Sequence, residues 1–284
     1  MTDLKTAERA AAGPRTVEGV VNYVAEMSER PRYYANDHSK DVMILDPRAV
    51  PIEDARGRAD PPALDREGFT LVRHVSAVTD FRDGDEVARV HPGEIQQLLL
   101  QLTGADRVVT TGTGGILRFS EKLDDVGKLN NSWPARFIHI DVADGAAAAS
   151  AERARPRDIE RRVRRWAHYN VWRALSPPPQ DIPLAMCAAG SLRDEDLVVA
   201  DAIFDHHGQP EWSFESLMVR YNPRHRWSYF SNMTRDEALV FKTKDSDPSK
   251  AHHVPHSAFD DPSAPPDAPP RISIEMRATA FWFD

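Results

Sequence analysis

Residues 137–141 have the sequence Phe137-Ile138-His139-Ile140-Asp141, in which His139 and Asp141 are separated by one apolar residue. Side chains in a strand alternate between two faces, so the imidazole and the carboxylate are expected on the same face, where both can bind one metal ion. On a strand of a barrel, that face is the interior. A chain with 11 histidines shows a His-x-Asp pattern about once by chance, so the pair needs further support.

A third metal ligand is available far downstream, in a segment that contains His252, His253 and His256. A close His-x-Asp pair with a distant second histidine is the sequence form of the 2-His-1-carboxylate triad, which leaves open positions on iron(II). His256 leads directly into apolar chain, and we predict that it is the third ligand. His252 and His253 are interpreted as surface residues.

Apolar residues occupy every second position between residues 270 and 277. Read as a strand, this segment places Arg271, Ser273, Glu275 and Arg277 on one face. An arginine and a serine two residues apart can together hold one end of a dicarboxylate. The alternative is an ordinary half-exposed strand whose charged row faces water.

The remaining pattern predicts a mainly β protein with flanking helices, because many short strands without alternating helices favour an antiparallel sandwich or barrel. We expect helices over residues 92–102 and 156–175, with the arginine run from Arg161 to Arg165 on a solvated face. The Ala-rich stretch Gly145–Ala154 is expected to be mobile, as part of a lid or a helix start. The predicted strands are Gly68–His74, Arg107–Thr111, Arg136–Val142, Leu197–Phe204, Glu211–Tyr221, Trp227–Phe230, Ala238–Lys242 and Ile272–Phe283. A flexible N-terminus over residues 1–15 and one domain over residues 16–284 complete the expected organisation.

The net charge is −8, from 36 Lys and Arg against 44 Asp and Glu, which gives no general attraction to nucleic acid or to anionic membranes. The sequence contains no run of 18 apolar residues, so it predicts no membrane span. The single cysteine, Cys187, cannot form an internal disulfide and is expected in the core, and the N-terminus has no apolar signal sequence. We therefore expect a cytoplasmic protein without nucleic-acid or membrane partners.

The order His139-x-Asp141, His256, Arg271-x-Ser273 resembles the iron(II)- and 2-oxoglutarate-dependent oxygenases, and more narrowly the family of fungal gibberellin desaturase and a component of cephamycin 7-methoxylation. The resemblance covers about residues 68–281. It is carried by Gly68–Leu71, His139-x-Asp141, Asn170–Arg173, Pro183–Cys187, Trp227–Phe230, Glu237–Lys242, Asp245-Ser246, His256-x-Ala258-Phe259 and Arg271-x-Ser273-x-Glu275-x-Arg277.

This resemblance implies a double-stranded β-helix, that is, a cupin-like jelly-roll barrel. It also implies a non-haem dioxygenase that uses Fe(II), 2-oxoglutarate and O2 to hydroxylate or desaturate an unactivated C–H bond of a small molecule in secondary metabolism. Ala188 stands where the family tends to have an aspartate. The stretch between His256 and Arg271 is longer than in plant-type oxygenases, so Arg277 remains a rival to Arg271 and Ser273 for the co-substrate carboxylate.

Four further polar residues in the matched stretches, Asn170, Arg173, Tyr229 and Lys242, are candidates for substrate binding. Each has an ordinary alternative, such as a helix-dipole contact for Arg173 or a solvent-facing position for the tyrosine and the lysine. Two other functions use the same ligands: a non-catalytic partner subunit that retains the barrel, and a zinc-dependent hydrolase. The substrate and the oligomeric state are not determined by the sequence.

Overall fold

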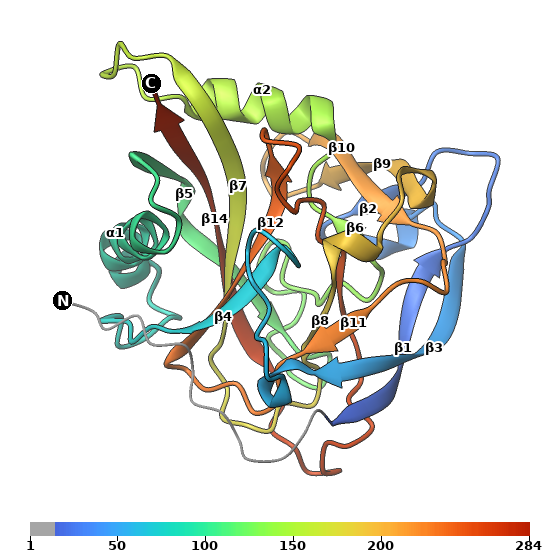
Figure 1. Cartoon of the computed structure of the whole chain (residues 1–284). Coiled ribbons are helices and arrows are strands. Elements are labelled where there is room, and N and C mark those ends of the chain that lie inside the picture. The colour runs from blue at the N-terminus through green and yellow to red at the C-terminus, as the bar shows by residue number, and fades with distance from the viewer. Residues whose placement is uncertain (1–14) are drawn as a thin grey trace.

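The structure is a computed structural model that describes residues 15–284. Two β-sheets enclose the interior of the protein (Figure 1). The predicted flexible segment 1–15 lies outside the described residues apart from Arg15. One sheet has five strands, in the spatial order β4 (Phe69–Arg73), β12 (Glu237–Asp245), β7 (Val163–Ala174), β14 (Ile272–Phe283) and β5 (Arg107–Phe119). The prediction of a mainly β protein with flanking helices is confirmed.

The second sheet has nine strands. Their order is β1 (Thr16–Val24), β3 (Leu45–Asp54), β11 (Trp227–Tyr229), β8 (Leu184–Cys187), β13 (His256–Ala258), β6 (His139–Ile140), β10 (Trp212–Val219), β9 (Leu197–Phe204) and β2 (Arg32–Tyr34). Four short 3-10 helices lie at His38–Lys40, Ala55–Gly57, Ala189–Ser191 and Asp194–Asp196. The predicted strands Leu197–Phe204 and Ile272–Phe283 match β9 and β14, whereas Arg136–Val142 shortens to the two residues of β6.

The helix predicted for residues 156–175 is wrong, because Val163–Ala174 forms the strand β7. This strand lies between β12 and β14, and its residues from Ala167 to Ala174 are all buried. A strand that is covered on both faces has no polar alternation, so its apolar residues can match helical spacing by accident. Of the adjacent arginines, Arg161, Arg162 and Arg164 are exposed, as predicted, although not on a helix. Arg165 is half-buried and forms a salt bridge of 2.5 Å with the buried Asp245.

Helix α1 (Gly84–Thr103) covers the outer face of the five-stranded sheet (Figure 1). It begins eight residues before the predicted start at Pro92, because the Asp83 side chain accepts hydrogen bonds from the first free backbone N–H groups. It ends at Gly104, which has a left-handed φ of 65°. Within residues 15–284, neither this helix nor any other has the length and apolar character needed to cross a membrane.

Helix α2 (Asp144–Ala154) is formed by the Ala-rich stretch and contacts β7 and β10 (Figure 1). Its first residue accepts a hydrogen bond of 2.6 Å from His253 and pairs with Lys244 at 2.7 Å. His168 of β7 also lies 2.9 Å from the carbonyl of Ala147. The interpretation of this stretch as a helix start is therefore confirmed, and its N-terminal half is fixed to the sheet.

Arg173 of β7 lies under α1, where its guanidinium donates to the backbone carbonyl of His74 at 2.7 Å and contacts the His74 Nδ1 at 2.6 Å. Because arginine has no acceptor, the histidine must be neutral to accept this contact. Burial and the positive charge of Arg173 lower the pKa of His74 from 6.5 to about 4. The folded protein therefore binds this proton more weakly than the unfolded chain does.

We expect the free energy of unfolding to fall as the pH drops from 6.5 towards 4, since the neutral His74 stabilises the fold fully above pH 6.5. The difference between the two pKa values corresponds to about 3 kcal/mol at full protonation. Urea denaturation at pH 7.5, 5.5 and 4.5 measures the effect. Since His74→Gln keeps an acceptor but cannot titrate, it should remove the His74 contribution and so reduce this pH dependence, and an unchanged slope in that variant would contradict the prediction.

Candidate functional site

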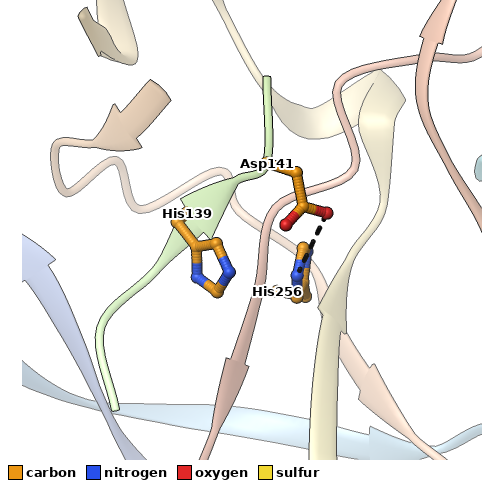
Figure 2. Close-up of side chains that lie close together, drawn as sticks. All are labelled: His139, Asp141 and His256. Atoms are coloured by element: carbon orange, nitrogen blue, oxygen red, sulfur yellow. Dashed lines mark ion pairs between the residues drawn. The ribbon is translucent and has the colours of Figure 1, made fainter. Parts of the chain in front are cut away.

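His139, Asp141 and His256 converge on one point of the barrel interior, and their ligand atoms all lie within 4.8 Å of one another (Figure 2). His139 belongs to β6, and Asp141 follows directly after that strand. His256 opens β13 and pairs directly with His139 in the sheet. The sheet therefore brings together two histidines that are far apart in sequence, and the rings lie 4.3 Å apart between centroids.

Both histidines present the same ring nitrogen to the centre of the site. The Nδ1 of His139 lies 3.1 Å from the carbonyl of Phe137, and the Nδ1 of His256 lies 3.2 Å from the carbonyl of Val254. A carbonyl only accepts, so each Nδ1 carries the hydrogen and each Nε2 keeps a free lone pair. The Nε2 of His256 lies 3.9 Å from the nearer oxygen of Asp141. Two imidazole nitrogens and one carboxylate oxygen form the donor set that suits iron(II).

Burial keeps these imidazoles in the neutral form that can bind a metal. It lowers the pKa of His139 to about 3, and the neighbouring His256 adds to the effect. Burial also lowers the pKa of His256, although Asp141 opposes it. At neutral pH neither ring has to lose a proton before a metal binds.

Two neighbours hold the Asp141 carboxylate. Arg277 donates to one of its oxygens at 2.5 Å, and Asn170 donates to the other at 2.5 Å. Burial opposes ionisation of Asp141, but Arg277 and the two histidines outweigh it and hold the pKa of the carboxyl well below its usual value. The carboxylate is therefore charged and fixed in orientation.

Arg271 and Ser273 lie on the same interior face of the five-stranded sheet and carry unpartnered polar atoms. Arg271 is 1% exposed, and within residues 15–284 its side chain donates only to the carbonyl of Ile182, at 3.0 Å, while its Nε has no partner there. The hydroxyl of Ser273, fully buried, also has no partner among the described residues. Burial, followed by the positive charges of Arg118 and Arg136, lowers the pKa of Arg271 to about 9. Such a guanidinium lacks the anion that a buried cation requires.

Arg118 of β5 is a further cation here, which the sequence analysis missed. It stands directly opposite Ser273 in the sheet and donates to the carbonyl of Trp133 at 2.7 Å. Its charge acts on His139, His256 and Arg271. No local signal identified it, because the predicted strand ended at Thr111 whereas β5 continues to Phe119.

A cavity of about 510 Å³ lies beside Asp141, Asn170 and Arg277. Its walls come from α2, from β7 and β14, and from the start of β10, including Trp212 and Phe214. Volumes of this size are typical of small-molecule sites. The cavity connects the carboxylate of the triad to the surface beneath α2.

Three predicted substrate contacts are not brought to this site. Arg173 is engaged with His74 on the outer face of the sheet, and Lys242 pairs with Asp65 at 2.7 Å and Asp245 at 2.9 Å. Tyr229 is buried against Phe259 in the nine-stranded sheet. Arg173 and Lys242 are thus engaged with other protein groups, whereas the buried hydroxyl of Tyr229 has no hydrogen-bond partner among the described residues. The assignment of the three residues to the substrate stays a prediction.

The sequence analysis also interpreted His252 and His253 as surface residues and placed Cys187 in the core. His253 is 8% exposed and bonded to α2, so its interpretation as a surface residue is wrong. His252 is half-buried, and its Nδ1 lies 2.9 Å from the carbonyl of Lys250. Cys187 is fully buried, as predicted, and burial raises the pKa of its thiol to about 12.

Comparisons with known proteins agree with this geometry. A family model described as an oxidoreductase/YMDC permease-like domain matches residues 21–281. The hydroxylase/desaturase CTB9 of Cercospora beticola is 32% identical over 253 residues, which cover 84% of this chain and 77% of the relative. The alpha-ketoglutarate-dependent dioxygenase phiK of a fungal species is 31% identical over 278 residues, which cover 94% of this chain and 96% of the relative.

A solved structure shares the fold. The iron and alpha-ketoglutarate-dependent endoperoxidase NvfI superimposes with a TM-score of 0.76 at 24% identity, over 95% of this chain and 99% of its own. A variant of that protein gives a TM-score of 0.79 at 24% identity, over 96% of this chain and 100% of its own. The predicted jelly-roll barrel is confirmed.

Proposed function

The chain belongs to the family of iron(II)- and 2-oxoglutarate-dependent dioxygenases and is an oxidoreductase. From this premise we propose a role for each residue of the site. Its cofactor is Fe(II), and its co-substrates are 2-oxoglutarate and O2. The two alternatives, a non-catalytic partner subunit and a zinc-dependent hydrolase, are therefore set aside.

His139, Asp141 and His256 are the residues that would hold iron(II). The free Nε2 atoms and the charged carboxylate support this assignment, and the backbone carbonyls of Phe137 and Val254 orient the two rings. Arg277 and Asn170 would hold the carboxylate in one orientation, because each donates a hydrogen bond to one of its oxygens. With its co-substrates, the bound metal supplies the oxidant that removes a hydrogen atom from an unactivated C–H bond, and 2-oxoglutarate becomes succinate and carbon dioxide.

Arg271 and Ser273 would bind the distal carboxylate of 2-oxoglutarate, and the observation that carries this proposal is that both have buried polar atoms without partners. A carboxylate placed there would accept from the guanidinium Nε and the serine hydroxyl, and would neutralise the buried charge. Arg277 is a weaker candidate because Asp141 and Glu275 already neutralise it. Arg118 adds positive charge for a dianionic co-substrate.

The substrate would be a small, largely apolar molecule of secondary metabolism that enters the cavity beneath α2. A substrate in this cavity would lie beside Asp141 and Asn170, against walls that include aromatic and alanine side chains. The outcome would be hydroxylation or desaturation. We keep three narrower predictions as proposals: one domain over residues 16–284, a cytoplasmic location, and the closer likeness to gibberellin desaturase and the cephamycin component.

The test of this assignment is the visible charge-transfer band of a keto-acid chelate. Adding iron(II) and 2-oxoglutarate to the purified protein without oxygen is expected to produce the band, because the triad leaves adjacent metal positions free for the keto-acid. Succinate, which has the distal carboxylate but no keto group, serves as the matched control and should give no band. Absence of the band with 2-oxoglutarate, while iron is bound stoichiometrically, would contradict the proposed site.

A further inference from the structure

Arg153 is the one charged side chain on the cavity wall that has no counter-ion among residues 15–284. Asp141 and Arg277 neutralise each other, and Glu215 forms a salt bridge of 3.0 Å with Arg30. No carboxylate of the described residues lies within salt-bridge distance of Arg153. The cavity wall thus carries one positive charge, on the exposed Arg153, that is not paired with a carboxylate of the described residues.

Arg153 lies far along α2 from the metal ligands. Four residues of the helix line the cavity at intervals of three and four, which places them on one face: Ala146, Ala149, Ser150 and Arg153. The first three have small side chains and leave space for a ligand. Arg153 lies nine residues after the helix start at Asp144, which corresponds to roughly 13 Å of helix. Asp141 is three residues before that start, so the cation and the triad lie at opposite ends of the cavity.

An exposed aromatic surface forms the facing wall. Trp212 is 48% exposed and lines the cavity, and its ring stacks on Phe204 at 4.2 Å between centroids, with the ring planes 12° apart. Phe214 extends the stack, at 5.3 Å from Phe204. A rigid aromatic face left open in a cavity is suited to a flat apolar ligand.

We propose that Arg153 binds the carboxylate of a largely apolar monocarboxylic substrate, whose ring body lies on Trp212 while a distant carbon is oxidised beside Asp141. This inference rests on the proposed function. A single guanidinium matches one carboxylate in a bidentate arrangement. A dianion such as a phosphate monoester fits less well, because a single guanidinium neutralises only one of its two charges.

A purely structural role for Arg153 makes a different prediction. The residue lies in the last turn of α2, where a cation also stabilises the helix dipole. In that case its removal would lower the thermal stability slightly, and binding would not depend on the charge of the ligand.

The test compares a fluorescent acid with its uncharged analogue. The protein loaded with iron(II) and 2-oxoglutarate is titrated without oxygen with 1-pyrenebutyrate and with 1-pyrenebutyramide, and heats of binding give the dissociation constants. We expect the wild type to bind the acid about tenfold more tightly than the amide, as a charge-assisted hydrogen bond implies. Arg153→Gln should abolish this preference by weakening only the acid, Arg153→Lys should keep part of it, and Trp212→Ala should weaken both ligands.

Arg157→Gln is the matched control, because Arg157 is an exposed cation that follows the same end of α2, pairs with Glu152 and does not line the cavity. It should leave both affinities unchanged. The proposal is overturned if Arg153→Gln keeps the preference for the acid, if Arg157→Gln reduces it equally, or if the wild type binds neither ligand. Recording the keto-acid band in each sample separates the two proposals. Absence of the band counts against the metal and co-substrate site. Presence of the band without a preference for the acid over the amide counts only against the role of Arg153.

Discussion

His256→Ala is expected to lose iron(II) and to oxidise no substrate at a measurable rate. The substitution removes one of three metal ligands, and changes in residues that only orient such ligands already cost about 10- to 100-fold in metal affinity or activity. We therefore expect a loss of more than about 100-fold in iron affinity. Iron content after dialysis and the formation of succinate from 2-oxoglutarate measure the result.

His252→Ala is the matched control for this prediction. This neighbouring histidine contacts the carbonyl of Lys250 and lies outside the triad, so its removal should leave iron content and turnover unchanged. Circular dichroism verifies that His256→Ala still folds, since the lost ring packs against Phe241 at 4.7 Å between centroids. A folded His256→Ala protein with a full complement of iron would show that the metal is held elsewhere.

Arg271→Leu is expected to raise the KM for 2-oxoglutarate about 10- to 150-fold, which corresponds to the roughly 1.5–3 kcal/mol of a hydrogen bond to a charged group. The reason is that Arg271 would supply the charged donor to the distal carboxylate. Steady-state kinetics with varied 2-oxoglutarate measure the change. The same substitution should not destabilise the protein without ligand, because a leucine removes a buried guanidinium that has no counter-ion.

Thermal unfolding gives the second readout for Arg271. In the wild type, 2-oxoglutarate should raise the melting temperature in the presence of iron(II), and Arg271→Leu should lose most of this rise. Arg277→Leu is the comparison that distinguishes the two arginines, since Arg277 contacts Asp141 and its loss should weaken iron binding instead. A larger KM increase in Arg277→Leu than in Arg271→Leu would transfer the carboxylate anchor to Arg277.

The sequence alone placed side chains on faces wherever the backbone is a strand with strict alternation. His139 and Asp141 were predicted on one face of a short strand, and their ligand atoms do converge. Arg271, Ser273 and Arg277 were predicted on one face of a strand, and Ser273 and Arg277 do lie four positions apart in the unbroken register of β14 with β7, whereas Arg271 directly precedes β14. The period of two is a local property of the strand, so it needs no knowledge of the neighbours.

The tertiary structure decided everything that depends on which strands pair and on what covers them. The strand β7 was mistaken for a helix because its burial on both faces removes the alternation that would reveal it. The pairing of β13 with β6, which brings His256 to His139, joins segments whose separation in the chain carries no local signal. The position of Arg118 opposite Ser273 and the cavity under α2 likewise arise only when distant elements pack together. The sequence therefore determined the candidate ligands and their faces, whereas sheet pairing and burial decided which of them meet and which polar groups are left without a partner.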